Sequence, residues 1–284
     1  MTRLAGSTML VTGAAHGLGR QLAVQASRRG ARIVAWDLDG SALDDLAAEL
    51  GSALLARSVV DVTDIESVAA GVAEVPGGAD AVDIVVNNAG VVSGARLVEL
   101  QPQQIQRTFA VNALALYWVT KAFLPSMLRL GRGHVVTMAS AAGLVGVARQ
   151  TDYSASKHAA VGFMESLRAE LRRDDAAIST TTVCPFYIDT GMFEGARSKL
   201  PWLLPILHEP DVAARILRAV ERDRAMLRLP PVVASLAVGR VLPTRLFDRL
   251  MDVLGVNESM DEFVGRSAPV ELDGTTGTRD LRAG

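Results

Sequence analysis

The chain of 284 residues contains a single cysteine, Cys184, which excludes a disulfide bond within the chain. One thiol is typical of a reducing compartment, and its place at the end of an apolar run predicts a packed, inert side chain. The formal net charge is −2 and no block of basic residues is present, so nucleic acid is not an expected partner. The four histidines are scattered without the spacing of metal ligands, so we predict no metal site.

Long hydrophobic runs are also missing. The longest apolar stretch, Leu229 to Gly239, is too short to cross a bilayer and contains two consecutive prolines. A strand-like run, Thr8 to Thr12, starts almost at once, which argues against an N-terminal signal peptide. Because hydrophobic residues still make up 49% of the chain, a large core can form, and we expect a soluble, cytoplasmic protein.

The sequence does contain a regular alternation of strand-like and helical segments. Apolar, β-branched runs predict strands at Thr8–Thr12, Arg32–Trp36, Leu54–Val60, Asp83–Val86, Gly133–Ala139 and Ile178–Cys184. Helical patterns lie at Leu18–Arg29, Ser41–Leu50, Ile65–Glu74, Gln103–Leu130 and Asp152–Arg173. This alternation predicts an α/β fold, with a doubly wound parallel sheet in one domain over residues 1–229.

A glycine-rich stretch, Thr12-Gly-Ala-Ala-His-Gly-Leu-Gly19, follows the first strand and opens the first helix. Gly13 permits a tight turn, while Gly17 and Gly19 allow the backbone to approach a pyrophosphate at the helix N-terminus. The alternative is an ordinary strand-to-helix turn. The flanking strand and helix favour a Rossmann-type dinucleotide site.

Polar residues end the next three strands, where ligands bind in open α/β sheets. Asp37 lies about twenty residues after the glycines, where a carboxylate can bind both ribose hydroxyls and repel a 2′-phosphate. This favours NAD over NADP, and His16 is only a weak substitute for the arginine that NADP prefers. Asp39 is the better candidate for a turn or helix cap. Asp61-Val62 and Asn87-Asn-Ala-Gly90 end the following strands, although strand-end polar residues are also common turn formers.

Tyr153 and Lys157 are spaced by four residues in a predicted helix, so both lie on one face. A cation beside a phenol stabilises the phenolate and lowers its pKa, which would make the pair an acid/base for alcohol and carbonyl interconversion. Taken alone, the motif favours a solvated surface pair, because Tyr-x-x-x-Lys occurs by chance on many helices. Ser140 ends the fifth strand thirteen residues earlier, and it can supply a second hydroxyl to a substrate oxygen that gains charge. A simple strand-end cap is the alternative for Ser140.

In this order and near these spacings, the glycine loop, Asp61-Val62, Asn87-Asn-Ala-Gly90, Asn112, Ser140 and Tyr153-x-x-x-Lys157 resemble the short-chain dehydrogenase/reductase family. The resemblance covers residues 5 to about 222. It implies that Ser140 bonds the substrate oxygen, that Tyr153 exchanges the proton and that Lys157 binds the nicotinamide ribose. It further implies that Asn112 holds a water that relays protons and that Thr190 anchors the carboxamide.

The dinucleotide site predicted from these features comprises Gly13, His16, Gly17, Leu18, Gly19, Asp37, Leu38, Asp61, Val62, Asn88, Ala89, Gly90, Tyr153, Lys157, Pro185, Ile188 and Thr190. Phe186 stands where many members of the family have glycine, which departs from the common pattern. The stretch Cys184 to Gly195 instead resembles the branch of retinol dehydrogenases, retinal reductases and lipid-droplet hydroxysteroid dehydrogenases. The tail is similar to that branch as well, which implies a helix around Asp211–Arg222, a strand Met226–Leu229 and then an apolar segment. That branch implies a lipophilic alcohol or ketone as substrate.

Hydrophobic residues crowd the segment 190–208, which we expect to form a lid over the substrate. The alternative is a helix that simply packs on the core. The predicted substrate-binding residues are Ser140, Phe186, Met192, Phe193, Leu203 and Leu207.

Residues 230–266 are predicted to form an apolar, helical C-terminal extension of the same domain, and residues 267–284 a flexible tail. Thr244 could cap a helix that ends before Gly255 and carries an apolar stripe. The opposite face has both signs of charge, so packing against protein is favoured over peripheral contact with a membrane.

The sequence therefore predicts an NAD-dependent enzyme that interconverts a lipophilic alcohol and its ketone or aldehyde. One rival is a 3-oxoacyl-thioester reductase that uses NADPH, which Asp37 disfavours. Another is a non-catalytic, dinucleotide-sensing protein of a lipid surface. The set Asn112, Ser140, Tyr153 and Lys157 argues against it, because a sensor does not need a proton relay. The family resemblance implies a homodimer or homotetramer built on the helices 103–130 and 152–173.

Overall fold

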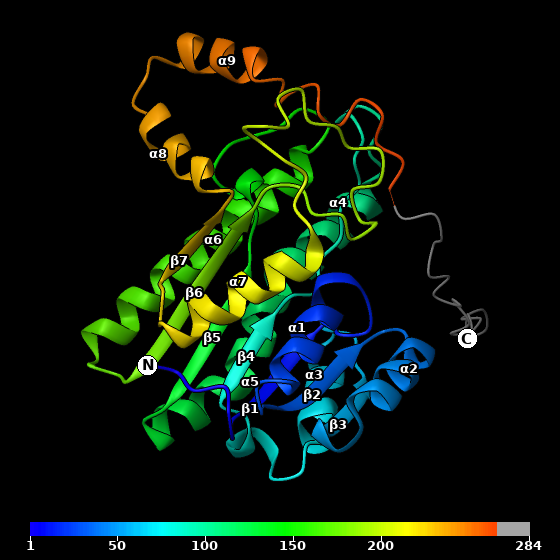
Figure 1. Ribbon diagram of the computed structural model, residues 1–284, viewed down its shortest axis with the longest axis vertical. Helices are drawn as coiled ribbons and strands as arrows, with labels where there is room; N and C mark the ends of the chain where they lie inside the picture. Colours follow the sequence, from blue (N-terminus) through cyan, green and yellow to red (C-terminus); the bar gives the residue numbers. More distant parts are fainter. Residues whose placement is uncertain (266–284) are drawn as a thin grey trace, which may run out of the picture.

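A computed structural model describes residues 1–265, apart from the side chains of residues 237 and 238. Seven parallel strands form one sheet in the order β3-β2-β1-β4-β5-β6-β7 (Figure 1). The strands are β1 (Thr8–Thr12), β2 (Arg32–Asp37), β3 (Leu54–Val59), β4 (Ile84–Asn87), β5 (Gly133–Met138), β6 (Ile178–Pro185) and β7 (Met226–Leu229). The fold class predicted from the sequence is confirmed.

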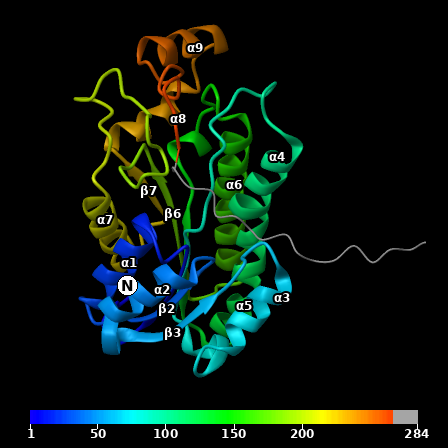
Figure 2. The same cartoon turned by 90° about the vertical axis from the view of Figure 1, so that its right-hand side faces the viewer.

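Helices cover both faces of the sheet (Figure 2). On one face lie α1 (Gly17–Ser27), α2 (Gly40–Leu50) and α7 (Glu209–Glu221). On the other lie α3 (Ile65–Ala73), α4 (Pro102–Phe109), α5 (Ala115–Leu130) and α6 (Thr151–Arg173). Each layer buries its own apolar cluster against the sheet, one around Leu22 and Ile33 and the other around Trp36 and Phe123. Strands buried on both faces read as continuous apolar runs, which explains why their positions could be predicted.

The strand order reverses between β1 and β4, because β2 and β3 lie on one side of β1 while β4 to β7 extend the other way. Such a reversal separates the loops at the carboxyl edge and opens a crevice there. The crevice lies between the glycine loop after β1 and the turn after β4. This is where the predicted site residues converge.

One predicted helix is broken. The segment 103–130 was expected to be continuous, but a π-helical turn, Ala110–Leu114, separates α4 from α5. Its middle residue is Asn112, which is buried. A π turn inserts one residue into the helix and redirects a side chain, and such turns are frequent at functional sites.

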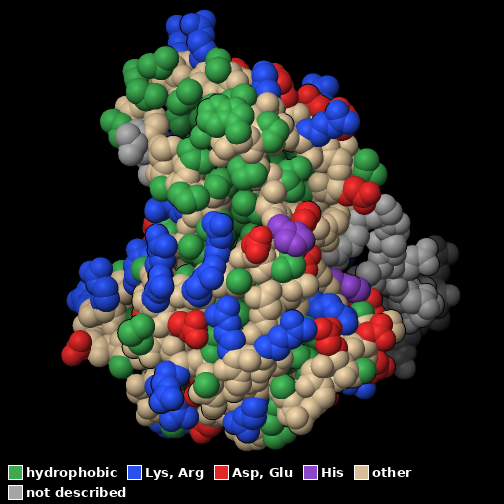
Figure 3. Space-filling model, in the orientation of Figure 1, with side chains coloured by type: hydrophobic (Ala, Val, Ile, Leu, Met, Phe, Trp, Pro, Cys, Tyr) green, Lys and Arg blue, Asp and Glu red, His purple; other side chains and the backbone are tan. Residues whose placement is uncertain are grey.

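The C-terminal extension lies over the carboxyl edge of the sheet and contains α8 (Ser235–Gly239) and α9 (Thr244–Val253) (Figure 1). The prediction that Thr244 caps α9 is wrong, since Pro243 occupies the cap position and no side chain caps the helix. Hydrophobic side chains gather over this end of the molecule (Figure 3). They include exposed Val241 and Leu246 of the extension and Trp202 of the lid. The predicted tail lies outside the described residues, and among residues 1–265 no helix is both long and apolar enough to span a membrane.

His134, on β5, gives the fold a predictable response to acid. Its ring is fully buried, with Nδ1 2.8 Å from the Thr2 hydroxyl and Nε2 2.8 Å from the Thr181 hydroxyl. Burial lowers its pKa from 6.5 to about 4. The unfolded chain therefore binds one more proton than the folded chain between these two values. The free energy of unfolding should fall by on the order of 3 kcal/mol as the pH drops from about 6.5 through 4.

Urea unfolding of the wild type and of His134→Asn between pH 7 and pH 4 measures this effect. The variant keeps a side chain that can form hydrogen bonds but loses the titrating ring. Its unfolding free energy should depend less steeply on pH. Equal slopes for the two proteins would contradict the assignment.

Candidate active site

The glycine loop has the tight geometry that a dinucleotide site requires. Gly13 and Gly17 have φ angles of +64° and +50°, in the left-handed region that favours glycine. A Cβ on Gly19 would lie 1.9 Å from the Gly13 carbonyl oxygen and 2.6 Å from Asn88 Nδ2. No other residue fits at position 19. This close contact packs the start of α1 against the turn, and the helix N-terminus, where backbone N–H groups lack partners within the helix, lines the crevice.

Asn88 and Thr12 hold this loop in place. Asn88 Nδ2 donates to the carbonyl oxygens of Thr12 (2.9 Å) and Gly13 (3.1 Å). The Thr12 hydroxyl accepts hydrogen bonds from the backbone N–H groups of Asn88 and Ala89, each at 3.0 Å. Asn88 therefore braces the loop, besides lining the crevice. Sequence reasoning missed Thr12, since a threonine that ends a strand resembles any other β-branched residue.

The two carboxylates at the end of β2 and in the turn after it have different hydrogen-bond partners, and the prediction that Asp39 is a helix cap is confirmed. Asp37 Oδ2 accepts a hydrogen bond from Ala15 N at 2.9 Å, which ties the end of β2 to the glycine loop. Asp39 caps α2 by accepting from Ala42 N, and this bond, with a second from His16, lowers the pKa of Asp39 to about 2. His16 is thus paired with Asp39, 2.9 Å away. Asp37 remains the carboxylate available to a ribose.

Asp61 lines the crevice and also shapes the turn after β3. Its Oδ1 accepts from the backbone N–H of Thr63 at 2.9 Å and from the Thr63 hydroxyl at 2.7 Å. Val62 beside it is almost fully buried and lines the same crevice. The turn-forming role and the predicted cofactor contact are therefore compatible.

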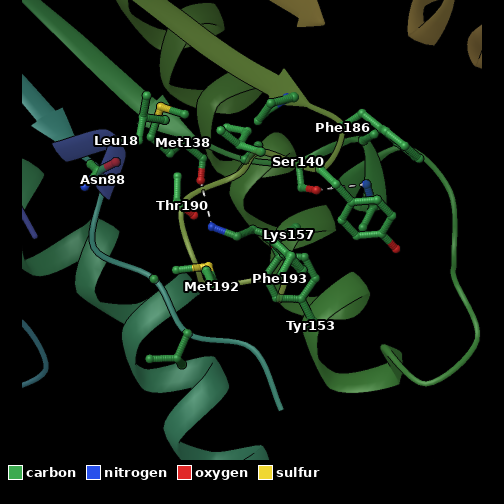
Figure 4. Close-up of a pocket in the computed structure, with 18 of the residues that line it drawn as sticks. Leu18, Asn88, Met138, Ser140, Tyr153, Lys157, Phe186, Thr190, Met192 and Phe193 are labelled. Carbon is green, nitrogen blue, oxygen red and sulfur yellow. Dashed lines mark hydrogen bonds between the residues drawn. The ribbon is translucent and has the colours of Figure 1, made fainter. Parts of the chain in front are cut away.

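Ser140, Tyr153 and Lys157 come together at the carboxyl end of β5 (Figure 4). Lys157 Nζ donates to the Met138 carbonyl oxygen at 2.8 Å and lies 5.7 Å from the centroid of the Tyr153 ring. Ser140 Oγ accepts from Ala142 N at 3.1 Å, so its own proton is left for another acceptor. The serine thus caps the turn after β5 and also faces the cavity.

Burial, rather than the neighbouring cation, is the largest effect on the acid/base pair. It raises the pKa of the Tyr153 phenol well above its ordinary value, although a hydrogen bond with Ser140 acts in the opposite direction. Burial also lowers the pKa of Lys157 to about 8. The expected net lowering of the Tyr153 pKa is therefore wrong for this structure, because burial outweighs any acidifying effect of Lys157. Near neutral pH the phenol is protonated and the lysine is still mainly charged.

Asn112 lies behind the cavity rather than in its wall. Its Oδ1 accepts from Val91 N and its Nδ2 donates to Val91 O, both at 2.9 Å, while Nδ2 also lies 3.0 Å from Ser156 Oγ. The side chain ties the turn after β4 to α6. A Cβ built on Gly90 would lie 3.4 Å from Asn112 Oδ1 and 3.6 Å from Lys157 Nζ, so both groups border the same point. The role of Asn112 in a proton relay stays a prediction.

A single cavity of about 690 Å³ joins the crevice to a chamber beyond Tyr153. All the residues predicted to bind the dinucleotide line this cavity, as do Ser140, Phe186, Met192, Phe193 and Leu203. Leu207 does not. Its backbone N–H donates to Tyr187 O at 2.8 Å, its backbone pairs with Ile188, and its side chain packs against the main core, so the prediction that it binds substrate is wrong.

The chamber wall is largely apolar, and sequence reasoning missed part of it. Phe193 packs edge-on against the Tyr153 ring, with centroids 5.7 Å apart. The lid consists of turns rather than a helix and contributes Leu203 and Leu204, while the extension contributes Met251 and Leu254. The apolar stripe predicted on the last helix was the signal in the sequence that could have identified Met251 and Leu254. Only the tertiary fold shows that one edge of this stripe closes the chamber.

The residues present fit a nicotinamide dinucleotide. The cradle at Gly19 excludes any side chain, the N-terminus of α1 lines the crevice, and Asp37 ends β2 at the distance along the chain that ribose recognition requires. No described residue blocks the passage from the glycine loop to Tyr153, since both line one cavity.

Comparisons with known proteins agree with this geometry. Residues 7–201 match the family model for short chain dehydrogenase. Epidermal retinol dehydrogenase 2 of Mus musculus is 40% identical over 269 residues, covering 93% of this chain and 87% of the relative. Estradiol 17-beta-dehydrogenase 11 of Rattus norvegicus is 38% identical over 269 residues, covering 92% and 88%.

A solved structure of a short chain dehydrogenase/reductase from Burkholderia phymatum in complex with NAD is also similar. It superimposes with a TM-score of 0.74 at 26% identity, covering 85% of this chain and 95% of that one. The chain belongs to the short-chain dehydrogenase/reductase family, in the branch of the retinol and hydroxysteroid dehydrogenases, and is an oxidoreductase that uses a nicotinamide dinucleotide.

Proposed function

We propose that the protein interconverts a lipophilic alcohol and its ketone or aldehyde, with NAD(H) as the cofactor and Tyr153 as the general acid/base. The observation that carries this proposal is the position of Tyr153 and Ser140. Both lie where a dinucleotide crevice meets an apolar chamber within one cavity. An apolar chamber excludes water from the reacting carbon and suits a hydrophobic substrate.

The bound dinucleotide supplies or accepts the hydride. For reduction, the protonated Tyr153 phenol donates its proton to the substrate oxygen as negative charge develops there. Ser140 donates a second hydrogen bond to that oxygen. Its Oγ accepts from Ala142 N, so the hydroxyl proton is available for the substrate. Lys157, charged below a pKa of about 8, stabilises the phenolate that remains. Asn112 holds the turn after β4 against α6 and would place a water that returns the proton.

NAD is the proposed cofactor because Asp37 ends β2 inside the cavity. A 2′-phosphate would bring negative charge beside a carboxylate already bonded to Ala15 N, and no described arginine ends the same strand or the turn after it. His16 cannot easily compensate, since it pairs with Asp39.

Asp37→Asn is expected to reduce the preference for NADH over NADPH by about tenfold or more, because the change removes the charge but retains an acceptor for Ala15 N. Fluorescence titration of both dinucleotides measures the ratio of the two dissociation constants. Asp44→Asn is the control, since Asp44 is an exposed carboxylate on α2 that pairs with Arg57. An unchanged ratio in Asp37→Asn would show that Asp37 does not select the cofactor.

The substrate class rests on the chamber and on the names of the relatives, which are a retinol dehydrogenase and an estradiol dehydrogenase. NADH absorbance measured with a panel of retinoid, steroid and aliphatic alcohols and ketones tests the proposal. We expect turnover with at least one hydrophobic member and little with short polar alcohols. Failure of the whole panel with both dinucleotides would overturn it.

We further propose a homodimer or homotetramer built on α5 and α6, as the resemblance implies. The exposed leucines Leu114, Leu128 and Leu130 at the ends of α5 support such an interface. Light scattering measures the state directly, and a monomer at micromolar concentration would refute this part of the proposal.

A further inference from the structure

The apolar chamber contains two polar side chains that the proposed reaction does not use, Gln150 and Tyr187. Both line the cavity and both are buried, with 1% and 7% of their surfaces exposed. Gln150 is the residue just before α6, but its side chain does not cap that helix. A buried amide in an apolar wall is unfavourable unless it finds partners, so its presence calls for a physical reason.

A chain of hydrogen bonds fixes both side chains. Gln150 Nε2 donates to the Tyr187 hydroxyl oxygen at 3.3 Å, and that hydroxyl lies 2.8 Å from Ser259 Oγ in the C-terminal extension. Ser259 Oγ donates its single proton to Val256 O at 2.6 Å. The proton between Tyr187 and Ser259 must therefore come from Tyr187. Burial raises the pKa of the Tyr187 phenol, so this proton is retained.

Because Tyr187 donates its proton to Ser259, the orientation of the Gln150 amide is also determined. If the amide were flipped, Tyr187 would have to donate to Gln150, and the Tyr187 and Ser259 oxygens would face each other with no proton between them. The Nε2 group therefore points to Tyr187. The Gln150 Oε1 atom and the second N–H of the amide have no hydrogen-bond partner among the described residues.

We infer that Gln150 is a specificity residue that binds a second hydroxyl group on the substrate, and this inference rests on the proposed function. A hydroxyl can donate to Oε1 or accept from the second N–H. Gln150 immediately precedes α6 and Tyr153 lies in its first turn, so both side chains reach the same cavity from one end of this helix. We therefore place the second hydroxyl on a carbon near the reacting one. The preferred substrates are lipophilic diols and hydroxyketones.

A site built to bond a substrate hydroxyl rejects the analogue that lacks it, because its own polar groups then stay buried without partners. The wild type should reduce 3-hydroxy-2-decanone with a kcat/KM about tenfold or more above that for 2-decanone. Gln150→Leu should bring the two substrates to within about threefold of each other. Tyr187→Phe, which releases the amide from its orientation, should weaken the preference while turnover of 2-decanone continues.

Gln103→Leu, an exposed glutamine on α4, is the matched control and should keep the wild-type preference. Thermal shift with NAD⁺ present, comparing 2,3-decanediol with 2-decanol, gives a readout that does not need turnover. If the wild type turns over neither ketone, the proposed function fails, and a stronger shift by the diol that Gln150→Leu abolishes would still support the hydroxyl site. Equal turnover of the two ketones by the wild type, or equal thermal shifts with the diol and the alcohol, would overturn the inference that Gln150 binds a substrate hydroxyl.

Discussion

Tyr153→Phe is expected to lower kcat by at least about 10²- to 10⁴-fold, the range that general acid/base catalysis supplies. The variant removes the only proposed proton donor and leaves the ring in place. Phe keeps the edge contact with Phe193 and the apolar neighbours in the chamber. The Tyr153 side chain is almost fully buried, so bulk water cannot readily replace the phenol as a proton source.

Stopped-flow measurement of hydride transfer, together with titration of NADH, separates chemistry from binding. Hydride transfer should slow by the stated factor, while the dissociation constant of NADH changes by less than about threefold, a small shift in free energy. Tyr117→Phe is the control, because Tyr117 is a half-exposed tyrosine on α5 that packs against Phe163. Turnover by Tyr153→Phe at the wild-type rate would remove Tyr153 from the mechanism.

Gly19→Val is expected to abolish dinucleotide binding. Even a Cβ at this position lies 1.9 Å from the Gly13 carbonyl oxygen and 2.6 Å from Asn88 Nδ2. Neither backbone nor a bonded side chain can yield, since Asn88 already holds the Thr12 and Gly13 carbonyls. The glycine loop must therefore move away from α1, and the cradle for the pyrophosphate is lost.

Calorimetric titration with NAD should show a loss of affinity of about 100-fold or more, with a lower melting temperature, because over-packing typically costs about 1–3 kcal/mol. Gly162→Ala is the control. It lies within α6 with no atom within 4 Å of an added Cβ, so it should bind NAD normally and be slightly more stable. Tight NAD binding by Gly19→Val would contradict the role assigned to the loop.

The fold could be predicted because its strands are buried on both faces and separated by amphipathic helices. Each predicted strand differs from the observed one by at most one residue at either end. The main exception among the helices was the segment 103–130, where a π turn holds Asn112 against Val91 and Ser156. Local helix propensity does not encode that insertion, because tertiary hydrogen bonds to a buried amide stabilise it.

The site residues were predictable where the chemistry requires a fixed residue type at a fixed spacing. The glycine loop, Asp37 and the Tyr153–Lys157 pair all line one cavity, as expected. The prediction that Leu207 binds substrate failed because apolar composition does not tell which side of a loop faces the core. The bond between Tyr187 and Ser259 joins residues 72 positions apart, so only the folded chain reveals it.

The sequence also could not predict whether the pKa of Tyr153 is raised or lowered. Spacing alone places a cation beside the phenol and predicts a lower pKa. The lid and the C-terminal extension bury the ring, and desolvation then raises the pKa instead. The consequence is a phenol that holds its proton until a substrate oxygen takes it.

Deuterium transfer tests the central claim most directly. NADH labelled with deuterium at the transferred position of the nicotinamide is incubated with enzyme and a lipophilic ketone that the panel identifies, and the product alcohol is analysed by mass spectrometry and NMR. The product alcohol should carry deuterium on the carbinol carbon, and Tyr153→Phe should form at least about 100-fold less of this labelled alcohol in the same time. An unlabelled product alcohol would contradict direct hydride transfer, and equal rates of labelled-product formation by the two proteins would contradict the role of Tyr153.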